Sequence, residues 1–444
     1  MNKYKEILTQ KIISLKKNGA FHIVVGSFLT KFVSFFGSIF IVRFLSKADY
    51  GILSYYENFM GYFIVLVGHG LDTATLRYIV LEEDMPGKKG CYLHALKNGS
   101  LWNAALLAVS LLVVFFYPHK AAFQGQFLTG ALLMMCIPAV FLQMVSLFSL
   151  RGLYENRLYA LIAFAAAAIQ IVSRVVGAAA GGLHTTAGAR LIAELVCGLA
   201  CVAFMLKGRF SAVRSREMEK GTRHDMDVYS FQIMLTNGLW AIFMLNDVFL
   251  LGQFTGNEEL VADYKIAYVI PANLSILVSA VGIFVAPYFT RYDKEKNYAW
   301  IRGKLRLVLA VTTAVMGIVV LLCFIFAKPL ILLLFGEQYL SAVPIMRMLL
   351  IASLFNNGVR STIANILSAV GEQKRNLIVA GVGMAIQVTL ACLLIPRYGG
   401  MGVAFSSMIV YIFMSAALCV VVWNRYYSKK TIDAQSRNHE RNEL

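Results

Sequence analysis

Residues 306–327 read RLVLAVTTAVMGIVVLLCFIFA and carry one charged side chain, at their first position. A helix of about 20 apolar residues spans the roughly 30 Å hydrocarbon core of a bilayer, so this stretch predicts a transmembrane helix. The whole chain has the same character: 59% of its 444 residues are hydrophobic, 15% are charged and the mean hydropathy is +0.67. A soluble domain has about 25% charged residues. The composition therefore excludes a soluble globular protein and predicts a polytopic membrane protein.

Twelve stretches of this kind follow one another along the chain. They lie at about 21–42, 51–69, 98–117, 127–149, 159–181, 187–206, 229–252, 265–287, 306–327, 344–370, 376–395 and 401–423. Proline and glycine interrupt several of them, which a helical bundle tolerates when neighbouring helices satisfy the freed backbone groups. The sequence therefore predicts twelve transmembrane helices.

The net charge of +17 is distributed unevenly over the predicted loops. With the N-terminus in the cytoplasm, 30 of the 41 Lys and Arg residues fall in cytoplasmic loops and termini, seven in outer loops and four within spans. Loops rich in Lys and Arg stay in the cytoplasm, so both termini are predicted to be cytoplasmic. The same distribution explains the net charge without a nucleic-acid partner.

Three short matches indicate an internal repeat. Ala-Asp-Tyr at 48–50 recurs at 262–264, Ala-Ile-Gln at 168–170 recurs at 385–387, and Gly-Gly at 181–182 recurs at 399–400. Because six spans are an even number, the second copy enters the membrane in the same orientation as the first. The predicted fold class is all-α, with two parallel six-helix lobes around a central cavity, an arrangement found in transporters. The predicted segments are a cytoplasmic interfacial helix (1–20), an N-terminal lobe (21–206), a cytoplasmic linker (207–228), a C-terminal lobe (229–423) and a cytoplasmic basic tail (424–444).

Five charged side chains lie deep inside the predicted spans: Lys31, Arg174, Glu194, Asp247 and Arg360. Such a charge costs a few kcal/mol at the bilayer centre unless it faces water or a partner. Two interpretations stay open for the three cations. In one they pair with Glu194 or Asp247 on a neighbouring helix. In the other they line a wet cavity between the lobes and bind an anion, and the planar fork of arginine suits phosphate.

Polar residues also gather in the span at 344–370. Asn357, Arg360, Ser361 and Asn365 recur at spacings of three and four, so an α-helix presents them on one face. A polar stripe of this kind is costly in lipid, so it faces either water in a cavity or the polar groups of another helix.

Motifs of the common enzyme classes are absent from the sequence. It contains no G-x-x-x-x-G-K-[ST] phosphate loop, no H-E-x-x-H and no G-x-S-x-G. Its seven cysteines do not lie at metal-binding spacings. The sequence therefore predicts no ATP hydrolysis, no metal, no cofactor and no enzymatic activity.

Three motifs resemble a known family. RFLSKADYG at 43–51, FGEQY at 335–339 and LIPRYG at 394–399 are similar to motifs of the Wzx-type O-antigen and polysaccharide flippases, members of the multidrug/oligosaccharidyl-lipid/polysaccharide (MOP) exporter superfamily. The resemblance extends over about 20–425. It implies translocation of a polyprenyl-diphosphate-linked oligosaccharide (an O-antigen, capsule or exopolysaccharide repeat unit) from the inner to the outer leaflet of the bacterial cytoplasmic (inner) membrane.

With such a cargo, the charged and polar residues take two predicted roles. The predicted diphosphate- and sugar-binding residues are Lys31, Arg174, Arg360, Asn357 and Asn365, and the candidates for ion coupling are Asp247 and Glu194. Because no ATP site is present, alternating access is expected to draw on a proton or sodium gradient. The expected partners are the lipid-linked oligosaccharide, membrane lipids, the coupling proton or sodium ion, and polysaccharide polymerase or other assembly proteins.

Three other functions compete with this one. A multidrug exporter of the same superfamily takes cationic drugs and calls for a cavity dominated by acids, whereas the deep charges here are three cations and two acids. An intramembrane glycosyl- or acyltransferase would change the oligosaccharide itself. A scaffold in an envelope assembly complex would transport nothing.

Overall fold

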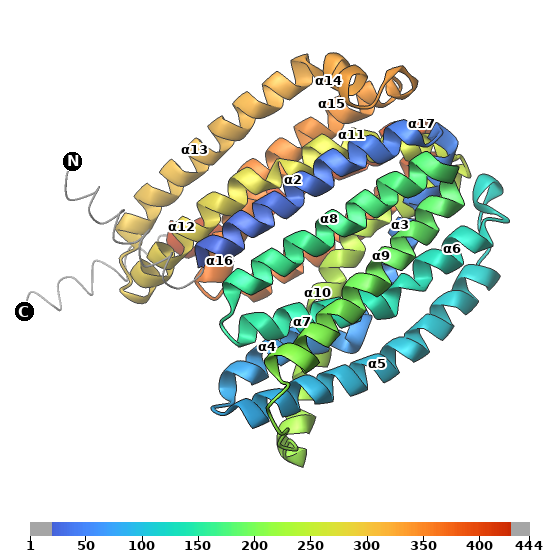
Figure 1. Cartoon of the computed structure of the whole chain (residues 1–444). Coiled ribbons are helices and arrows are strands. Elements are labelled where there is room, and N and C mark those ends of the chain that lie inside the picture. Colours follow the sequence, from blue (N-terminus) through green and yellow to red (C-terminus); the bar gives the residue numbers. More distant parts are fainter. Residues whose placement is uncertain (1–19, 428–444) are drawn as a thin grey trace, which may run out of the picture. The chain divides into compact units, whose positions relative to one another are not determined.

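The computed structural model describes residues 20–427, without the side chains of residues 20–24, 239–240, 276–277, 279–284 and 287. Every regular element in this part of the chain is a helix (Figure 1). Nearly all of the predicted interfacial helix (1–20) and most of the predicted basic tail (424–444) lie outside the described residues. The predicted all-α fold class is confirmed.

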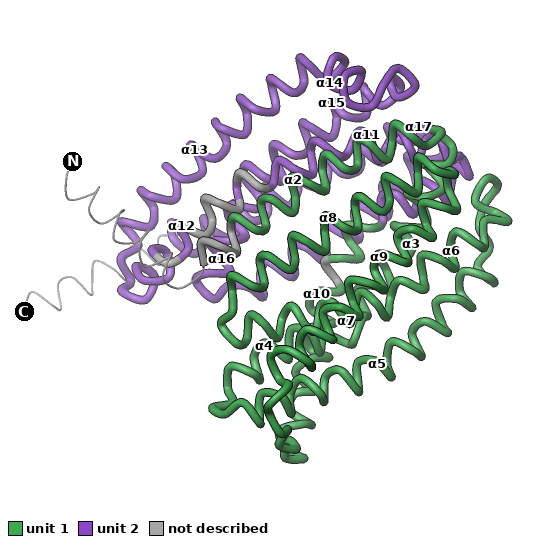
Figure 2. Tube along the Cα trace, in the orientation of Figure 1, with its two compact units in different colours: residues 1–245 green, residues 246–444 purple. Residues whose placement is uncertain are grey.

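The chain divides into two compact units, residues 1–245 (unit 1) and 246–444 (unit 2), drawn in different colours in Figure 2. The division falls within helix α10, Lys220–Thr255, whereas the sequence places a linker at 207–228. The bounds of the two lobes therefore stay a prediction.

Unit 1 contains the helices that precede this division. They are α2 (Ala20–Phe44), α3 (Lys47–Ile64), η1 (Val67–Gly70), α4 (Leu71–Leu81), α5 (Met85–Phe116), η2 (Ala121–Phe123), α6 (Phe127–Met134), α7 (Cys136–Gly152), α8 (Asn156–Gly181), α9 (Leu183–Ala203), η3 (Phe204–Arg209) and the first part of α10. Within this unit α2 packs along α8, and α8 packs along α9 (Figure 1). Side-chain caps mark several helix starts: the Ser46 side chain accepts a hydrogen bond from the Asp49 amide at the start of α3, and Asp84 caps α5 through the Gly87 amide.

Unit 2 contains the end of α10 and the helices that follow it. They are α11 (Glu258–Asn273), α12 (Ser275–Lys294), α13 (Tyr298–Ile325), α14 (Ala327–Leu334), η4 (Glu337–Tyr339), α15 (Ala342–Ser353), η5 (Leu354–Ser361), α16 (Thr362–Ala369) and α17 (Gln373–Tyr426). Its apolar core includes Phe289, Ile301, Ile363 and Leu418, which come from four of these helices.

Seven helices in the described chain are long and apolar enough to cross a membrane, or nine if each of two bent helix pairs counts as one span. The bent pairs are Lys47–Ile64 with Val67–Leu81 (43°) and Lys220–Gly238 with Ala241–Thr255 (46°). Two of the seven, Asn156–Arg209 and Gln373–Tyr426, are 54 residues long, about twice the length that a bilayer requires. Each contains two of the predicted spans, and α11–α12 covers the span predicted at 265–287.

The first of these long segments is an antiparallel hairpin. Ser173 Oγ of α8 donates to the Ala189 carbonyl of α9 at 2.9 Å, and Gln170 Nε2 donates to Glu194 Oε2 at 2.7 Å. Residue numbers thus fall along one helix as they rise along the other. The reversal takes place at Gly182, with φ 78° and ψ −142°, a conformation that only glycine adopts without strain.

The second hairpin repeats this construction. In α17 the chain reverses at Gly399, 217 positions after Gly182, with φ 53° and ψ −129°. An ion pair also recurs: Arg209 binds Glu155 in unit 1, and Arg425 binds Glu372 in unit 2. Both pairs join the end of a hairpin to the loop before that hairpin. A duplicated six-helix unit predicts matching features at a constant offset, and these features recur at an offset of 216 or 217 positions.

Candidate functional site

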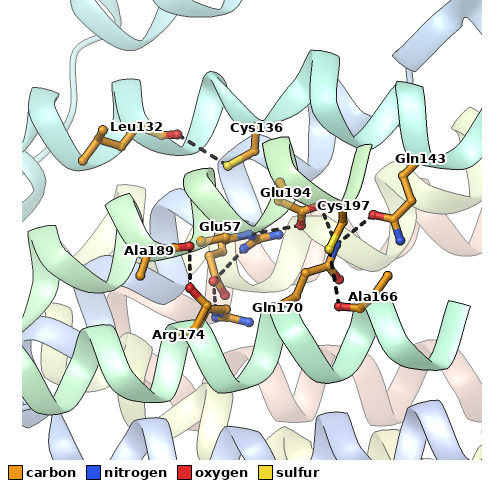
Figure 3. A network of polar contacts seen from close by, with 12 residues as sticks. Glu57, Leu132, Cys136, Gln143, Ala166, Gln170, Arg174, Ala189, Glu194 and Cys197 are labelled. Carbon is orange, nitrogen blue, oxygen red and sulfur yellow. Dashed lines mark hydrogen bonds and ion pairs between the residues drawn. The ribbon is translucent and has the colours of Figure 1, made fainter. Parts of the chain in front are cut away.

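Unit 1 contains a half-buried ionic network centred on Glu57 of α3 (Figure 3). Arg174 of α8 donates to Glu57 Oε1, and Arg190 Nη1 of α9 donates to the same oxygen at 2.7 Å. The side chains of the two arginines and of Glu57 are between 15% and 22% exposed. Because ions so poorly solvated are stable only when paired, this network holds α3 against the α8–α9 hairpin.

Glu194 extends the same network along α9. Its Oε1 lies 3.9 Å from Arg190 Nε, and its Oε2 accepts from Gln170 Nε2 at 2.7 Å. Gln170 also donates to Gln143 Oε1 at 2.8 Å, which joins α7 to the hairpin (Figure 3). Glu194, predicted to couple ions, is therefore held by one cation and one amide of its own unit.

Unit 2 contains a second polar cluster, centred on Asp247 of α10. Tyr264 Oη donates to Asp247 Oδ2 at 2.6 Å, and Ser407 Oγ donates to the same oxygen at 3.0 Å. Gln387 Nε2 donates to Oδ1 at 2.6 Å. The three donors are neutral and buried, and no ion pair joins Asp247 to another described residue.

The two clusters occupy equivalent positions of the repeat. Gln170 and Gln387 are 217 positions apart and each donates to a buried or half-buried carboxylate. At the same offset Arg190 corresponds to Ser407, and Glu194 to Tyr411. The unit 1 cluster therefore contains its own countercharges, whereas the three side chains that donate to Asp247 in unit 2 are neutral.

Lys31 lies on an exposed polar stripe of α2. The side chains of Ser27, Lys31 and Ser34 are all exposed, and their spacings of four and three place them on one helix face together with Ser38. A stripe of hydroxyls and one ammonium group is costly against lipid tails. A face of this composition is suited to water or to an anionic ligand.

Arg360 lies on η5, a π-helical turn between α15 and α16. It is 7% exposed, and its Nε donates to Asn356 Oδ1 at 2.6 Å. The π-turn adds a residue to the helical repeat, so the single face expected of an α-helix is lost. Asn357 is buried with Arg360, while Asn365 on α16 is exposed.

Sequence reasoning missed two of the most important side chains of unit 1. Glu57 lies inside the predicted span at 51–69 and Arg190 near the start of the predicted span at 187–206, but neither is among the five deep charges that the sequence indicates. With both included, the deep charges are four cations and three acids, so the excess that favoured an anionic cargo is still one cation but a smaller share of the total. Glu57 rather than Glu194 is the first partner of Arg174. The sequence contained one indication of where the polar clusters lie. Gln170 and Gln387 belong to the repeated tripeptide Ala-Ile-Gln, and each lies in one of the two clusters.

Comparison with solved structures identifies the class of fold. An inward-facing multidrug resistance transporter of the MATE family, in the MOP superfamily, superposes with a TM-score of 0.75 at 17% identity, over 91% of this chain and 96% of that one. The lipid II flippase MurJ in an inward closed conformation gives 0.69 at 15% identity, over 90% and 87%. A MOP superfamily transporter from Pyrococcus furiosus, described by the reverse polarity of its binding pocket, gives 0.60 at 14% identity, over 92% and 95%. The fold is that of the MOP superfamily.

Sequence comparison then identifies the family. Residues 15–293 match the profile of the polysaccharide biosynthesis protein family, and the chain belongs to that family. It is also 24% identical over 433 residues, 91% of this chain and 84% of the other, to an uncharacterised membrane protein of Methanocaldococcus jannaschii. The predicted resemblance is confirmed. The protein belongs to the polysaccharide biosynthesis family, contains several helices apolar enough to span a membrane, and has the fold of the MOP structures.

Proposed function

We propose that the protein is a flippase that moves a polyprenyl-diphosphate-linked oligosaccharide from the inner to the outer leaflet by alternating access, and that it is not an enzyme. The observation that carries this proposal is membership of the polysaccharide biosynthesis family in a chain with the MOP fold. A diphosphate and its sugars cannot cross hydrocarbon unaided. A transporter whose spans contain polar and cationic side chains offers them a hydrated route.

Each unit contains residues that we propose for binding the cargo. In unit 1, Lys31 on the exposed stripe of α2 would attract the diphosphate. In unit 2, Arg360 on η5 would bind phosphate, and Asn357 and Asn365 would contact phosphate or sugar. Arg174 is the weakest member of the set, because Glu57 already neutralises it. We place the protein in a bacterial cytoplasmic membrane with both termini inside, following the distribution of Lys and Arg.

Analysis of lipid-linked species in a deletion strain tests the cargo. We expect intact lipid-linked oligosaccharide to accumulate on the inner leaflet, because its synthesis continues while its export stops. An oligosaccharide of altered structure would instead indicate a transferase, and an unchanged lipid pool would exclude both functions. Wild-type chain expressed from a plasmid serves as the control and should restore export.

Multidrug export is the second candidate, because the superposition on a MATE-family transporter is as extensive as that on the flippase. The acids Glu57, Glu194 and Asp247 are the residues that would attract a cationic drug. Growth of the deletion strain on cationic dyes separates the two functions. If the protein is a flippase, its deletion should leave the sensitivity to dyes unchanged. If it is a drug exporter, its deletion should increase that sensitivity.

Asp247 is the proposed site of ion coupling. Its partners are neutral donors, and the buried Oε1 of Gln387 has no hydrogen-bond partner among the described residues. A proton or sodium ion at this place would compensate the carboxylate charge, and oxygen ligands of this type suit hard cations. Glu194 is less favoured, because Arg190 and Gln170 already satisfy it.

Asp247→Asn is expected to weaken the dependence of export on the ion gradient, because a neutral amide has no charge for the ion to compensate. Export by the wild type should therefore fall severalfold on addition of an uncoupler or a sodium ionophore, and export by the variant should fall by much less. Asp263→Asn is the matched control, since this buried aspartate accepts from Ser341 Oγ at 2.8 Å outside the cluster. An unchanged response of the Asp247 variant would contradict the role.

A further inference from the structure

Helices α3 and α4 are separated by a strained turn inside one bent span. Gly68, His69 and Gly70 all have left-handed backbone angles, with φ of 53°, 38° and 87°. A histidine in this region is strained, because its Cβ crowds the backbone. Groups of α5 satisfy the interrupted backbone: Asn103 Oδ1 accepts from the Gly68 amide at 3.1 Å, and Trp102 Nε1 donates to the Leu66 carbonyl at 2.7 Å.

The His69 imidazole has two close neighbours on other helices. Its Nδ1 lies 2.8 Å from Ser230 Oγ of α10. The indole of Trp102 packs edge-on against the ring, with centroids 5.3 Å apart. The imidazole is half-buried and thus links the strained turn to α10, the helix that continues past residue 245 into unit 2.

The Ser230 hydroxyl can serve His69 in either protonation state. It has one proton and two acceptors in reach, the Asp227 carbonyl at 2.8 Å and His69 Nδ1. When His69 is neutral with its proton on Nε2, Ser230 donates to Nδ1. When His69 is protonated, Nδ1–H donates to Ser230, whose own proton then goes to the Asp227 carbonyl. When His69 is protonated, both hydrogen bonds are therefore made, the one from His69 to Ser230 and the one from Ser230 to the Asp227 carbonyl. The bond from His69 to Ser230 is then charge-assisted.

The charges around His69 come from three elements. Asp227 on α10 is an acid of the same cluster and lies 3.0 Å from His94 Nε2 of α5. Asp72 on α4, three residues beyond His69, is buried, and the Thr73 hydroxyl lies 3.4 Å from its Oδ2. Helix α7 presents the apolar ring of Phe141 to Gly68. Among the described residues, Asp227 and His94 are thus the charged or titratable groups that act on the His69 imidazole. Asp227 offers countercharge to a protonated His69, whereas His94 offers none.

A cavity in unit 1 lies on the side of this cluster formed by Asp227 and His94. The cavity has a volume of about 670 Å³ and is lined by residues of α5, α10 and the segment between α9 and α10, including His94, Asn98 and Asp227. It is large enough to contain many water molecules. By the predicted orientation it opens toward the cytoplasm.

We propose that His69 is a proton-binding site of unit 1, supplied from this cavity and distinct from Asp247 in unit 2. A bound proton strengthens the contact between the strained turn and Ser230 of α10. The inference rests on the geometry of unit 1 alone and does not depend on which cargo is carried.

Trp102 supplies a direct readout, because a protonated imidazole in contact with an indole quenches its fluorescence far more than a neutral one. We expect the tryptophan emission of the purified full-length protein to fall in one titration between about pH 8 and pH 5, the range in which histidine changes charge. Trp102→Phe and His69→Gln should both remove this pH-dependent component. His94→Gln and His184→Gln should retain it, since His184 contacts Thr129 elsewhere in unit 1.

Two results would overturn the proposal. In the first, the emission of the wild type and that of Trp102→Phe depend on pH in the same way. The other is a component that survives in His69→Gln or disappears in His94→Gln, which would assign the titration to another group. If His69→Gln does not fold, the comparison of the wild type with Trp102→Phe and His94→Gln still tests the proposal. Because the assay involves no transport, its outcome is separate from that of the flippase proposal.

Discussion

Arg360→Ala is expected to abolish polymer export while the protein inserts at its normal level. The proposed role of the guanidinium is to hold the diphosphate by paired, charge-assisted hydrogen bonds, each worth about 1.5–3 kcal/mol. Loss of two such bonds predicts a decrease of about a hundredfold or more in export. Arg360→Lys keeps the charge without the planar fork, so it should preserve part of the activity.

Surface polymer in a deletion strain complemented with each variant measures this effect, normalised to the amount of protein in the membrane. Arg347→Ala is the matched control on the preceding helix. Arg347 lies 5.2 Å over the ring of Phe324 and donates to the Phe324 carbonyl at 3.3 Å, so its loss should leave export close to wild type. Normal export by Arg360→Ala would remove Arg360 from the cargo site.

Glu57→Gln is expected to be the most destabilising of the substitutions considered for unit 1. The change leaves Arg174 and Arg190 without their shared carboxylate, in surroundings where both are less than one-fifth exposed. Breaking a buried ion pair from one side costs about 3–5 kcal/mol, because an uncompensated charge remains. The purified variant should melt at a markedly lower temperature, and less of it should be recovered from membranes.

Glu82→Gln tests whether burial is the cause. Glu82 also binds an arginine, at 2.8 Å, but Arg216 is 57% exposed, and exposed pairs contribute about 0–1 kcal/mol. The double variant Glu57→Gln/Arg174→Gln should be more stable than Glu57→Gln alone, because one unpaired cation is removed and Arg190 keeps Glu194. Equal melting temperatures for Glu57→Gln and Glu82→Gln would show that the network contributes nothing beyond a surface pair.

The ion-paired network around Glu57 in unit 1 and the singly charged Asp247 cluster in unit 2 are suited to different tasks. On our proposal the network around Glu57 keeps three helices together, while Asp247 exchanges a cation. Substitutions in the Glu57 network should therefore act mainly on stability, and those around Asp247 mainly on coupling. The proposed titration of His69 would add a second proton-sensitive contact, at the helix that the two units share.

The twelve spans and the duplication were readable in the amino-acid sequence because both depend on local properties. Every span needs about 20 apolar residues whatever its neighbours are, so a stretch such as 306–327 can be predicted as a span from its own residues alone. The repeat was visible in tripeptides at a nearly constant offset, and Gly182 and Gly399 then proved to have closely similar backbone angles.

The partners of the buried charges depended on tertiary structure, because an ion pair between helices joins residues that the sequence separates by any distance. Glu57 and Arg190 are 133 positions apart, and nothing in the order of residues indicates that they meet. The π-turn at η5 likewise changes which residues share a face with Arg360, since one added residue shifts the helical phase. Membrane insertion is decided span by span through hydrophobicity, whereas the neutralisation of a charge is decided by packing between spans.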